Sequence, residues 1–228
     1  MEKIAAVLIA AHLIADFVLQ TGSMVNQKDR MGFLLVHAAS HAVLSYVVLQ
    51  AWTCWQAPVF VLFFHGVIDF AKRCFKTETP AIFIIDQMIH VFSLLFLAWM
   101  LVRFSWVPAF EGIGYKLLVG SSGFVACVQG AGYLIAKVTK RLIDENKLEL
   151  DGLQNGGKMI SRLERCIIFL FIFINQPSGI GFLFAAKSIL RFEEAKQQKL
   201  AEYILIGTLW SFSLAMALAF ATRWAIRL

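Results

Sequence analysis

The stretch AAHLIADFVLQ, residues 10–20, places His12 and Asp16 four positions apart in an otherwise apolar segment. The same spacing returns in FHGVIDF, residues 64–70, as His65 and Asp69. Residues four apart on a helix lie one above the other on the same face. Each stretch therefore predicts a helix that carries a histidine and an aspartate on one side.

The remaining three histidines follow the same rule. His37 is four residues before His41, and Asp86 is four residues before His90. Each of the five histidines in the chain thus has a histidine or aspartate partner one helical turn away. Side chains at this spacing can share one metal ion, as the two histidines of an HExxH helix do.

The four pairs also repeat in order along the chain. The two His/Asp pairs are separated by 53 positions, and the pairs His37/His41 and Asp86/His90 are separated by 49. The pattern predicts two helical hairpins of the same orientation, related by a pseudo-two-fold axis along the membrane normal. Together they would form a four-helix bundle with the paired side chains in its centre.

Composition places the chain among membrane proteins. Its 228 residues are 59% hydrophobic and only 16% charged, whereas soluble domains are about 25% charged. Several apolar runs are long enough to cross a bilayer. We predict an all-α integral membrane protein with 7–8 transmembrane helices, at about residues 3–19, 32–54, 58–72, 80–103, 116–137, 159–175, 179–191 and 202–222.

The organisation of the chain follows from these runs and from the polar segments between them. No basic run alternates with aromatic residues, so membrane lipid and not nucleic acid is the expected partner. The predicted regions are a four-helix metal-site bundle at 1–104 (repeats about 1–54 and 55–104), a small-residue-rich helix at 105–140, a cytoplasmic loop at 141–158 and a C-terminal helical region at 159–228.

The distribution of lysine and arginine predicts the orientation of the spans. Alternate loops carry most of the basic residues, and the richer set is expected to be cytoplasmic. That set comprises Lys28, Arg30, Lys72, Arg73, Lys76, Lys137, Lys140, Arg141, Lys147, Lys158, Arg162, Arg191, Lys196 and Lys199, against Lys3, Arg103, Lys116, Arg223 and Arg227 on the other side. Both termini are then predicted to face outward, in the cytoplasmic membrane of a bacterium.

In this topology all four pairs fall in the cytoplasmic half of the bilayer. Ionisable residues within a membrane are costly to bury and usually mark a functional site. We predict a divalent metal site, with zinc, manganese or iron as the ion, because imidazole and carboxylate ligands suit these metals. The predicted ligands are His12, Asp16, His37, His41, His65, Asp69, Asp86 and His90. A proton or ion pathway and a polar packing network are the alternatives.

The segments HLIADFVLQ, HAASH and HGVIDF, with Lys28 between the first two, resemble a bacterial membrane family known as domain of unknown function 3307. The resemblance covers the first hundred residues and implies no activity. The segment FAAKSILRFEEAKQQKLAEYILIGTLWSF is similar to the C-terminal extension of many members. Histidine and aspartate pairs on short spans also resemble, in residue types, the predicted membrane-bound metal-dependent hydrolases.

Basic residues of the second half are predicted at the same membrane face. Lys187 and Arg191 are four apart and predict a site for an anionic group such as a phosphate. The alternative is ordinary positive charge beside the headgroups.

Three functions fit these observations. The favoured one is a metal-dependent hydrolase acting on a lipid-like or phosphorylated substrate at the inner leaflet. The others are a di-iron membrane oxidase and a divalent cation transporter or sensor. The sequence does not identify a catalytic residue, the substrate or the oligomeric state.

Overall fold

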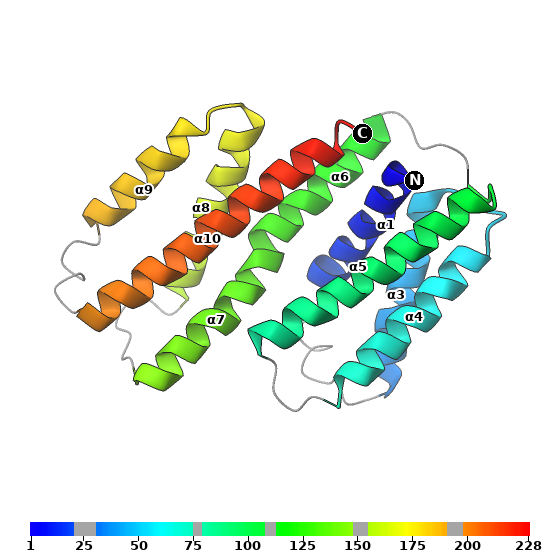
Figure 1. The fold of residues 1–228 in the computed structure, drawn as a ribbon, viewed down its shortest axis with the longest axis horizontal. Coiled ribbons are helices and arrows are strands. Elements are labelled where there is room, and N and C mark those ends of the chain that lie inside the picture. The colour runs from blue at the N-terminus through cyan, green and yellow to red at the C-terminus, as the bar shows by residue number, and fades with distance from the viewer. Residues whose placement is uncertain (21–30, 75–78, 108–112, 148–154, 191–197) are drawn as a thin grey trace. The chain divides into compact units, whose positions relative to one another are not determined.

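The computed structural model describes residues 1–20, 31–74, 79–107, 113–147, 155–190 and 198–228, and all regular structure in them is helical, as predicted (Figure 1). In chain order the elements are α1 (Glu2–Ile14), the π-helical turn η1 (Ala15–Leu19), α3 (Met31–Leu49), α4 (Gln56–Lys72), α5 (Pro80–Arg103), α6 (Ile113–Val125), the π-helical turn η2 (Ala126–Gly130), α7 (Ala131–Asn146), α8 (Gly156–Phe173), α9 (Ser178–Leu190) and α10 (Gln198–Ala225).

The chain divides into two compact units, which are described separately. Unit 1 comprises Met1–Val125 with Trp224–Leu228, and unit 2 comprises Ala126–Arg223. All eight predicted metal ligands lie in unit 1, whereas Lys187 lies in unit 2. The regions predicted from the sequence, with boundaries near residues 104, 140 and 158, stay a prediction.

Unit 1 contains a closed ring of four helices. Helix α1 packs on α3 and α5, and α4 packs on the same two helices from the opposite side of the ring. Successive helices run in opposite directions, as Figure 1 shows. Val7, Leu8 and Ala11 of α1 are fully buried, because α6 covers the side of α1 that faces away from the ring. An apolar helix buried on several sides is the expected outcome of a segment without a polar face.

Each helix of the ring presents a column of side chains at four-residue intervals to the interior. The columns are apolar at one end of the bundle and polar at the other, and their buried or half-buried members are Ile4, Leu8, His12 and Asp16; Leu49, Ser45, His41 and His37; Ala57, Val61, His65 and Asp69; and Ala98, Leu94, His90 and Asp86. The apolar ends form the hydrophobic core of unit 1. Histidines and carboxylates therefore form successive layers beyond that core.

Local features position two of the carboxylates. Asp16 lies in η1, where the main-chain N–H of Gln20 donates to the Ala15 carbonyl at 3.0 Å. This bond spans five residues instead of the four of an α-helix. π-helical turns are rare and occur often at functional sites. Helix α5, which carries Asp86, begins with Pro80, and the Thr79 hydroxyl accepts the Ile82 amide hydrogen at 3.2 Å. A capped start of this kind fixes the first turns of a helix.

Unit 2 has its own hydrophobic core and a buried arginine. The Arg165 guanidinium donates to the Val128 carbonyl in η2 from Nε and Nη2, at 3.2 and 2.9 Å, and to the Ser211 hydroxyl at 3.1 Å. A Cβ added at Gly132 would lie 2.8 Å from Arg165 Nη2, so a larger residue there would make the Arg165 side chain shift. Gly132 of the small-residue-rich segment thus leaves room for a guanidinium of α8.

Helix α7 continues six residues into the segment 141–158 that the sequence predicts as a loop. Arg141 Nε donates to Glu145 Oε1 at 2.6 Å, one turn apart, and the helix ends at Lys147 in a left-handed conformation with φ 51°. Lysine, arginine and glutamate are good helix formers, so polarity marks the end of an apolar run here and not the end of the helix.

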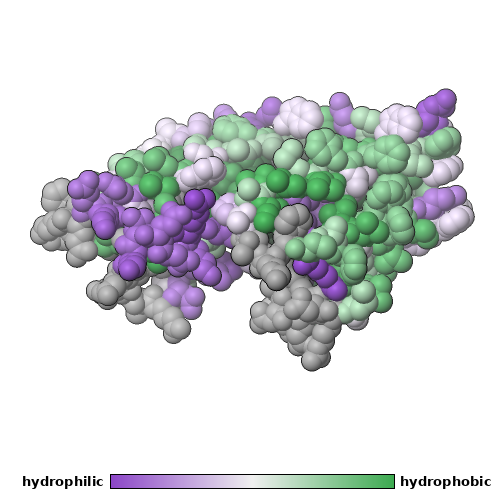
Figure 2. Space-filling view, turned by 60° about the horizontal axis from the view of Figure 1, so that its bottom comes forward, coloured by the Kyte–Doolittle hydropathy of each residue, from purple (hydrophilic) through white to green (hydrophobic). Residues whose placement is uncertain are grey.

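Four described helices are long and apolar enough to cross a membrane: Met31–Leu49, Pro80–Arg103, Ile113–Asn146 and Gln198–Ala225. Large apolar side chains point outward from them and from α4, among them Val43, Phe63 and Phe92, each about 60% exposed. Figure 2 shows hydrophobic surface over much of the visible face, with the largest hydrophilic area toward the left and smaller ones elsewhere, among them the right edge. Outward-facing apolar surface of this extent is typical of a membrane protein.

Candidate metal centre

The structure brings the four predicted pairs together inside the α1–α3–α4–α5 ring. His12, His37, His41, His65 and His90 are at most 5% exposed, and each histidine ring has another within 5.1 Å between centroids. The closest two rings are those of His41 and His65, which stack at 3.6 Å. Five imidazoles from four helices thus share one enclosed space.

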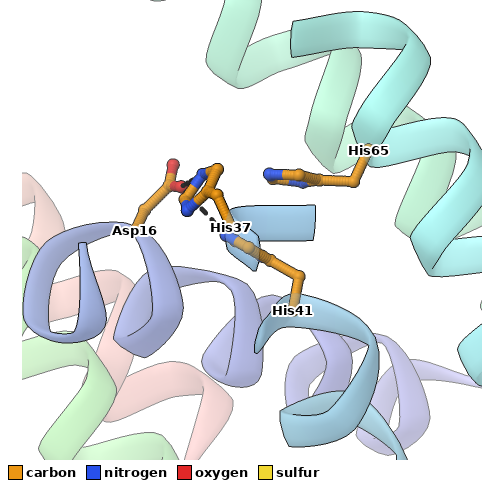
Figure 3. Close-up of side chains that lie close together, drawn as sticks. All are labelled: Asp16, His37, His41 and His65. Carbon is orange, nitrogen blue, oxygen red and sulfur yellow. Dashed lines mark ion pairs between the residues drawn. The ribbon is translucent and has the colours of Figure 1, made fainter. Parts of the chain in front are cut away.

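Asp16 is the first of two carboxylates around which these rings gather. Its Oδ1 lies 3.1 Å from His41 Nε2 and 3.4 Å from His37 Nε2, as the dashed lines in Figure 3 show. Its Oδ2 lies 3.5 Å from His12 Nε2 and accepts the Gln87 amide at 2.9 Å. His65 of α4 points toward this group from the opposite side of the bundle (Figure 3).

Asp69 is the second carboxylate. Its Oδ2 lies 3.4 Å from His65 Nε2 and 3.4 Å from His37 Nε2, and its Oδ1 lies 3.7 Å from His90 Nε2. The single Nε2 atom of His37 is therefore equally distant from Asp16 and Asp69. His37 joins the two carboxylate groups into one cluster.

The separations within the cluster match metal coordination better than hydrogen bonding. Nitrogen-to-oxygen hydrogen bonds in proteins are usually 2.7–3.2 Å long. Four ligand atoms bound to a tetrahedral zinc ion at about 2.0–2.1 Å lie about 3.3–3.4 Å from one another. Most of the nitrogen-to-oxygen distances in the cluster, from 3.1 to 3.7 Å, lie near that tetrahedral edge.

Several buried nitrogen atoms have no hydrogen-bond partner in the described part of the chain. They include Nε2 of His12, His65 and His90, all of which point into the cluster. Leaving a buried polar group unpaired costs about 1–3 kcal/mol, so such atoms are uncommon and call for an explanation. A bound cation would satisfy these atoms through their lone pairs.

The second nitrogen of His90 shows which of its ring atoms can bind a metal. His90 Nδ1 lies 2.9 Å from the Asp86 main-chain carbonyl, which can only accept a hydrogen bond. Nδ1 must therefore carry the proton, and Nε2 presents its lone pair to the cluster. Histidine ligands of metals are commonly held in this way by a carbonyl or carboxylate behind the ring.

Two overlapping sets of side chains could hold an ion. Asp16, His37, His41 and His65 form one, and His65, Asp69 and His90 form the other, with the ligand atoms of each set within 4.8 Å of one another. The donors are nitrogen and oxygen only, a set that suits zinc, manganese and iron. The residues present therefore fit a divalent ion, whose identity the donors do not decide.

Asp86 lies at the edge of the cluster and not in either set. Its Oδ2 forms an ion pair with Lys72 Nζ at 2.7 Å, and its Oδ1 lies 3.7 Å from His90 Nδ1. The sequence singled out Lys72 only as a loop charge, because its partner is on another helix. Gln87, which donates to Asp16, is a half-buried neighbour that sequence periodicity does not separate from a solvated glutamine.

The predicted anion site is described only in part. Lys187 forms an ion pair with the buried Glu164 at 2.8 Å, and its ammonium lies 5.7 Å from the Phe212 ring centroid. Glu164 thus already supplies an anionic partner. Arg191 lies outside the described residues, as do Lys28, Arg30, Lys76 and Lys196, so the role of Lys187 and Arg191 stays a prediction.

A small cavity of about 10 Å³ adjoins the histidine layer on the side of the apolar core. It is lined by His12, His41, Ser45, Phe60, Val61, Phe64, His65, His90, Ser93 and Leu94. That volume is about the minimum for one water molecule. The opposite side of the cluster is more open, since the Asp16, Asp69 and Lys72 side chains are 12%, 17% and 21% exposed.

Comparison with known family models finds a match in the N-terminal part of the chain. Residues 4–112 match the model of the family described as Protein of unknown function (DUF3307), so this part of the chain is similar to that family. No curated protein and no solved structure matches the chain. The matched segment includes all eight predicted ligands, and the resemblance to metal-dependent hydrolases is not shown by these comparisons.

Proposed function

We propose that the chain is a bacterial inner-membrane protein whose N-terminal bundle binds a divalent ion and uses it to hydrolyse a lipid-like or phosphorylated substrate. The main support for the metal site is a set of buried histidine Nε2 atoms whose distances from the Asp16 and Asp69 oxygens are close to those between two ligands of one zinc ion. Asp16, His37, His41 and His65 are the proposed primary ligands. His12, Asp69, Asp86 and His90 complete the centre.

The proposed hairpin repeat is supported by contacts that occur in matched pairs. His12–Asp16 and Asp16–His41 separations of 3.5 and 3.1 Å correspond to His65–Asp69 and Asp69–His90 separations of 3.4 and 3.7 Å. The ring contacts His12–His41 and His65–His90 correspond as well, at 5.1 and 4.3 Å. Related contacts are expected when two copies of one hairpin contribute equal halves of a site.

In the proposed reaction the bound ion supplies Lewis acidity to the substrate and to water. The chain provides the rest. The carboxylates lie at the open side of the cluster, where a substrate would arrive, and the histidines lie behind them. The second oxygens of Asp16 and Asp69 can accept a proton, and Gln87 holds Asp16 in its orientation by a hydrogen bond to Oδ2 at 2.9 Å.

The experiment that tests this function combines metal analysis with an activity assay. The protein, purified in detergent or nanodiscs, is expected to contain zinc or manganese and to release product from phospholipid or phosphorylated lipid substrates. A chelator should abolish release, and the same ion should restore it. Iron content with substrate oxidation would favour the oxidase, and ion uptake without hydrolysis would favour a transporter. Protein free of metal would leave polar packing as the explanation of the cluster.

The proposed topology is testable with a native cysteine. Cys74 is exposed between the end of α4 and the start of α5, and Ser105 is exposed just after the end of α5. In a variant that retains only Cys74, an impermeant maleimide should label inverted vesicles and not intact spheroplasts. A variant with only Ser105→Cys should show the reverse. Labelling of Cys74 from outside the cell would overturn the cytoplasmic placement of the cluster.

A further inference from the structure

Lys72 brings a positive charge to the edge of the metal centre. It is the last residue of α4, and its ammonium lies 2.7 Å from Asp86 Oδ2. The Asp86 carboxylate is only 7% exposed, so this ion pair is largely withdrawn from solvent. Among the described residues, Lys72 is the lysine or arginine that pairs with Asp86, and a buried carboxylate is strongly held to such a cation, because removing the partner would leave an uncompensated charge.

Asp86 has a second carboxylate oxygen that Lys72 does not hold, although Asp86 belongs to neither candidate ligand set. It lies one turn before His90, and its Oδ1 is buried without a hydrogen-bond partner in the described residues, 3.7 Å from His90 Nδ1. In the proposed repeat its counterpart is His37, whose Nε2 is 3.4 Å from both Asp16 and Asp69. One copy thus directs a ligand toward the centre, whereas the other directs a carboxylate toward Lys72.

The charge balance of the cluster explains this asymmetry. With neutral imidazoles, the carboxylates of Asp16, Asp69 and Asp86 and the ammonium of Lys72 have a net charge of minus two. One divalent ion neutralises that charge. A second divalent ion would leave an excess of two positive charges in a low-dielectric interior, which is costly.

The number of available ligands also favours one bound ion. His65 belongs to both candidate sets, and its Nε2 can bind only one ion at a time. If the first ion takes His65, only Asp69 and His90 remain in the second set. The Asp86 carboxylate, whose Oδ1 is 3.7 Å from His90 Nδ1, could add a third ligand only by turning toward Asp69, and the ion pair of its Oδ2 with Lys72 opposes that turn.

We propose that the Lys72 ammonium takes the place of a second divalent cation at Asp86 and so limits the centre to one ion. This inference rests on the proposed metal site. It makes Lys72 a residue that sets stoichiometry, not a ligand or a catalytic residue. Without its positive charge, Asp86 would be free to join Asp69 and His90 around a second ion.

The test is a zinc titration of the purified protein, read as bound zinc per chain by elemental analysis. Wild type is expected to bind one zinc ion and Lys72→Met two. Lys72→Arg, which keeps the charge, should bind one. The matched control is Lys187→Met, which removes the other buried lysine ion pair, at Glu164, and should also bind one. Adding Asp86→Asn to Lys72→Met should return the count from two to one.

Each outcome decides the proposal. Two zinc ions in wild type, or one in a folded Lys72→Met variant, would overturn the role of Lys72 while leaving the metal site intact. No zinc in wild type and in every variant would instead overturn the metal site on which the inference rests. If Lys72→Met does not fold, Lys72→Gln replaces it, and the wild-type count by itself still tests the limit of one ion.

Discussion

Replacing His65 by alanine is expected to remove most of the divalent ion from the purified protein, leaving less than about a tenth of the wild-type content. His65 belongs to both candidate ligand sets, and its Nε2 is buried without a hydrogen-bond partner in the described residues. Its loss therefore weakens every arrangement in which the cluster could hold an ion. The measurement is metal content per chain after gel filtration.

Two further variants serve as a comparison and a control for His65→Ala. His90→Ala removes a member of only one set, so it should retain more metal than His65→Ala. Ser93→Ala changes another residue that lines the adjoining cavity but removes no proposed ligand, and it should retain the wild-type content. Equal metal content in His65→Ala, Ser93→Ala and wild type would contradict the proposed site.

The helical periodicity of the sequence predicted much of the cluster. Spacing of four residues defines one helix face whatever the neighbouring helices do, and the pairs His12/Asp16 and His65/Asp69 indeed point into one interior. Pairs on different helices are expected to converge because ionisable side chains are costly to expose to lipid and therefore face the interior of a helical bundle. Such arguments need no knowledge of the contacts between helices.

Features that depend on contacts between helices or on local backbone geometry were not predictable. The ion pair of Lys72 with Asp86 joins α4 to α5, and that of Lys187 with Glu164 joins α9 to α8. Both lysines are ordinary basic residues near helix ends when only the sequence is considered. The π-helical turn at Asp16 likewise has no signal in AAHLIADFVLQ, since apolar residues favour an α-helix equally well.

Three apolar helices are shorter than the four that are long enough to cross a membrane. Helix α4 has 17 residues and rises about 25 Å at 1.5 Å per residue, somewhat less than the hydrocarbon core of a bilayer. Helices α1 and α9 have 13 residues each. Short helices can span if flanking residues extend toward the headgroups, so the count of 7–8 spans stays a prediction.

Removing the ion is expected to destabilise unit 1 by a large amount. A ligand present at a thousand times its dissociation constant stabilises the native state by about 4 kcal/mol. For a unit of this size, that corresponds to a lower unfolding temperature by about 10 °C or more. A large loss is expected because the metal-free cluster keeps carboxylates and imidazoles buried together.

Two native cysteines allow each unit to be followed separately. Cys54 is buried in the core of unit 1 and Cys127 in the core of unit 2, so a thiol-reactive dye labels each only after its surroundings open. In variants that retain one of these cysteines, a chelator should lower the labelling temperature of Cys54 more than that of Cys127. Adding back the divalent ion should restore it. An equal decrease in labelling temperature at both cysteines would mean that the chelator destabilises the whole chain. No decrease at Cys54 would mean that the bundle is stable without metal, with its histidines paired only to Asp16 and Asp69.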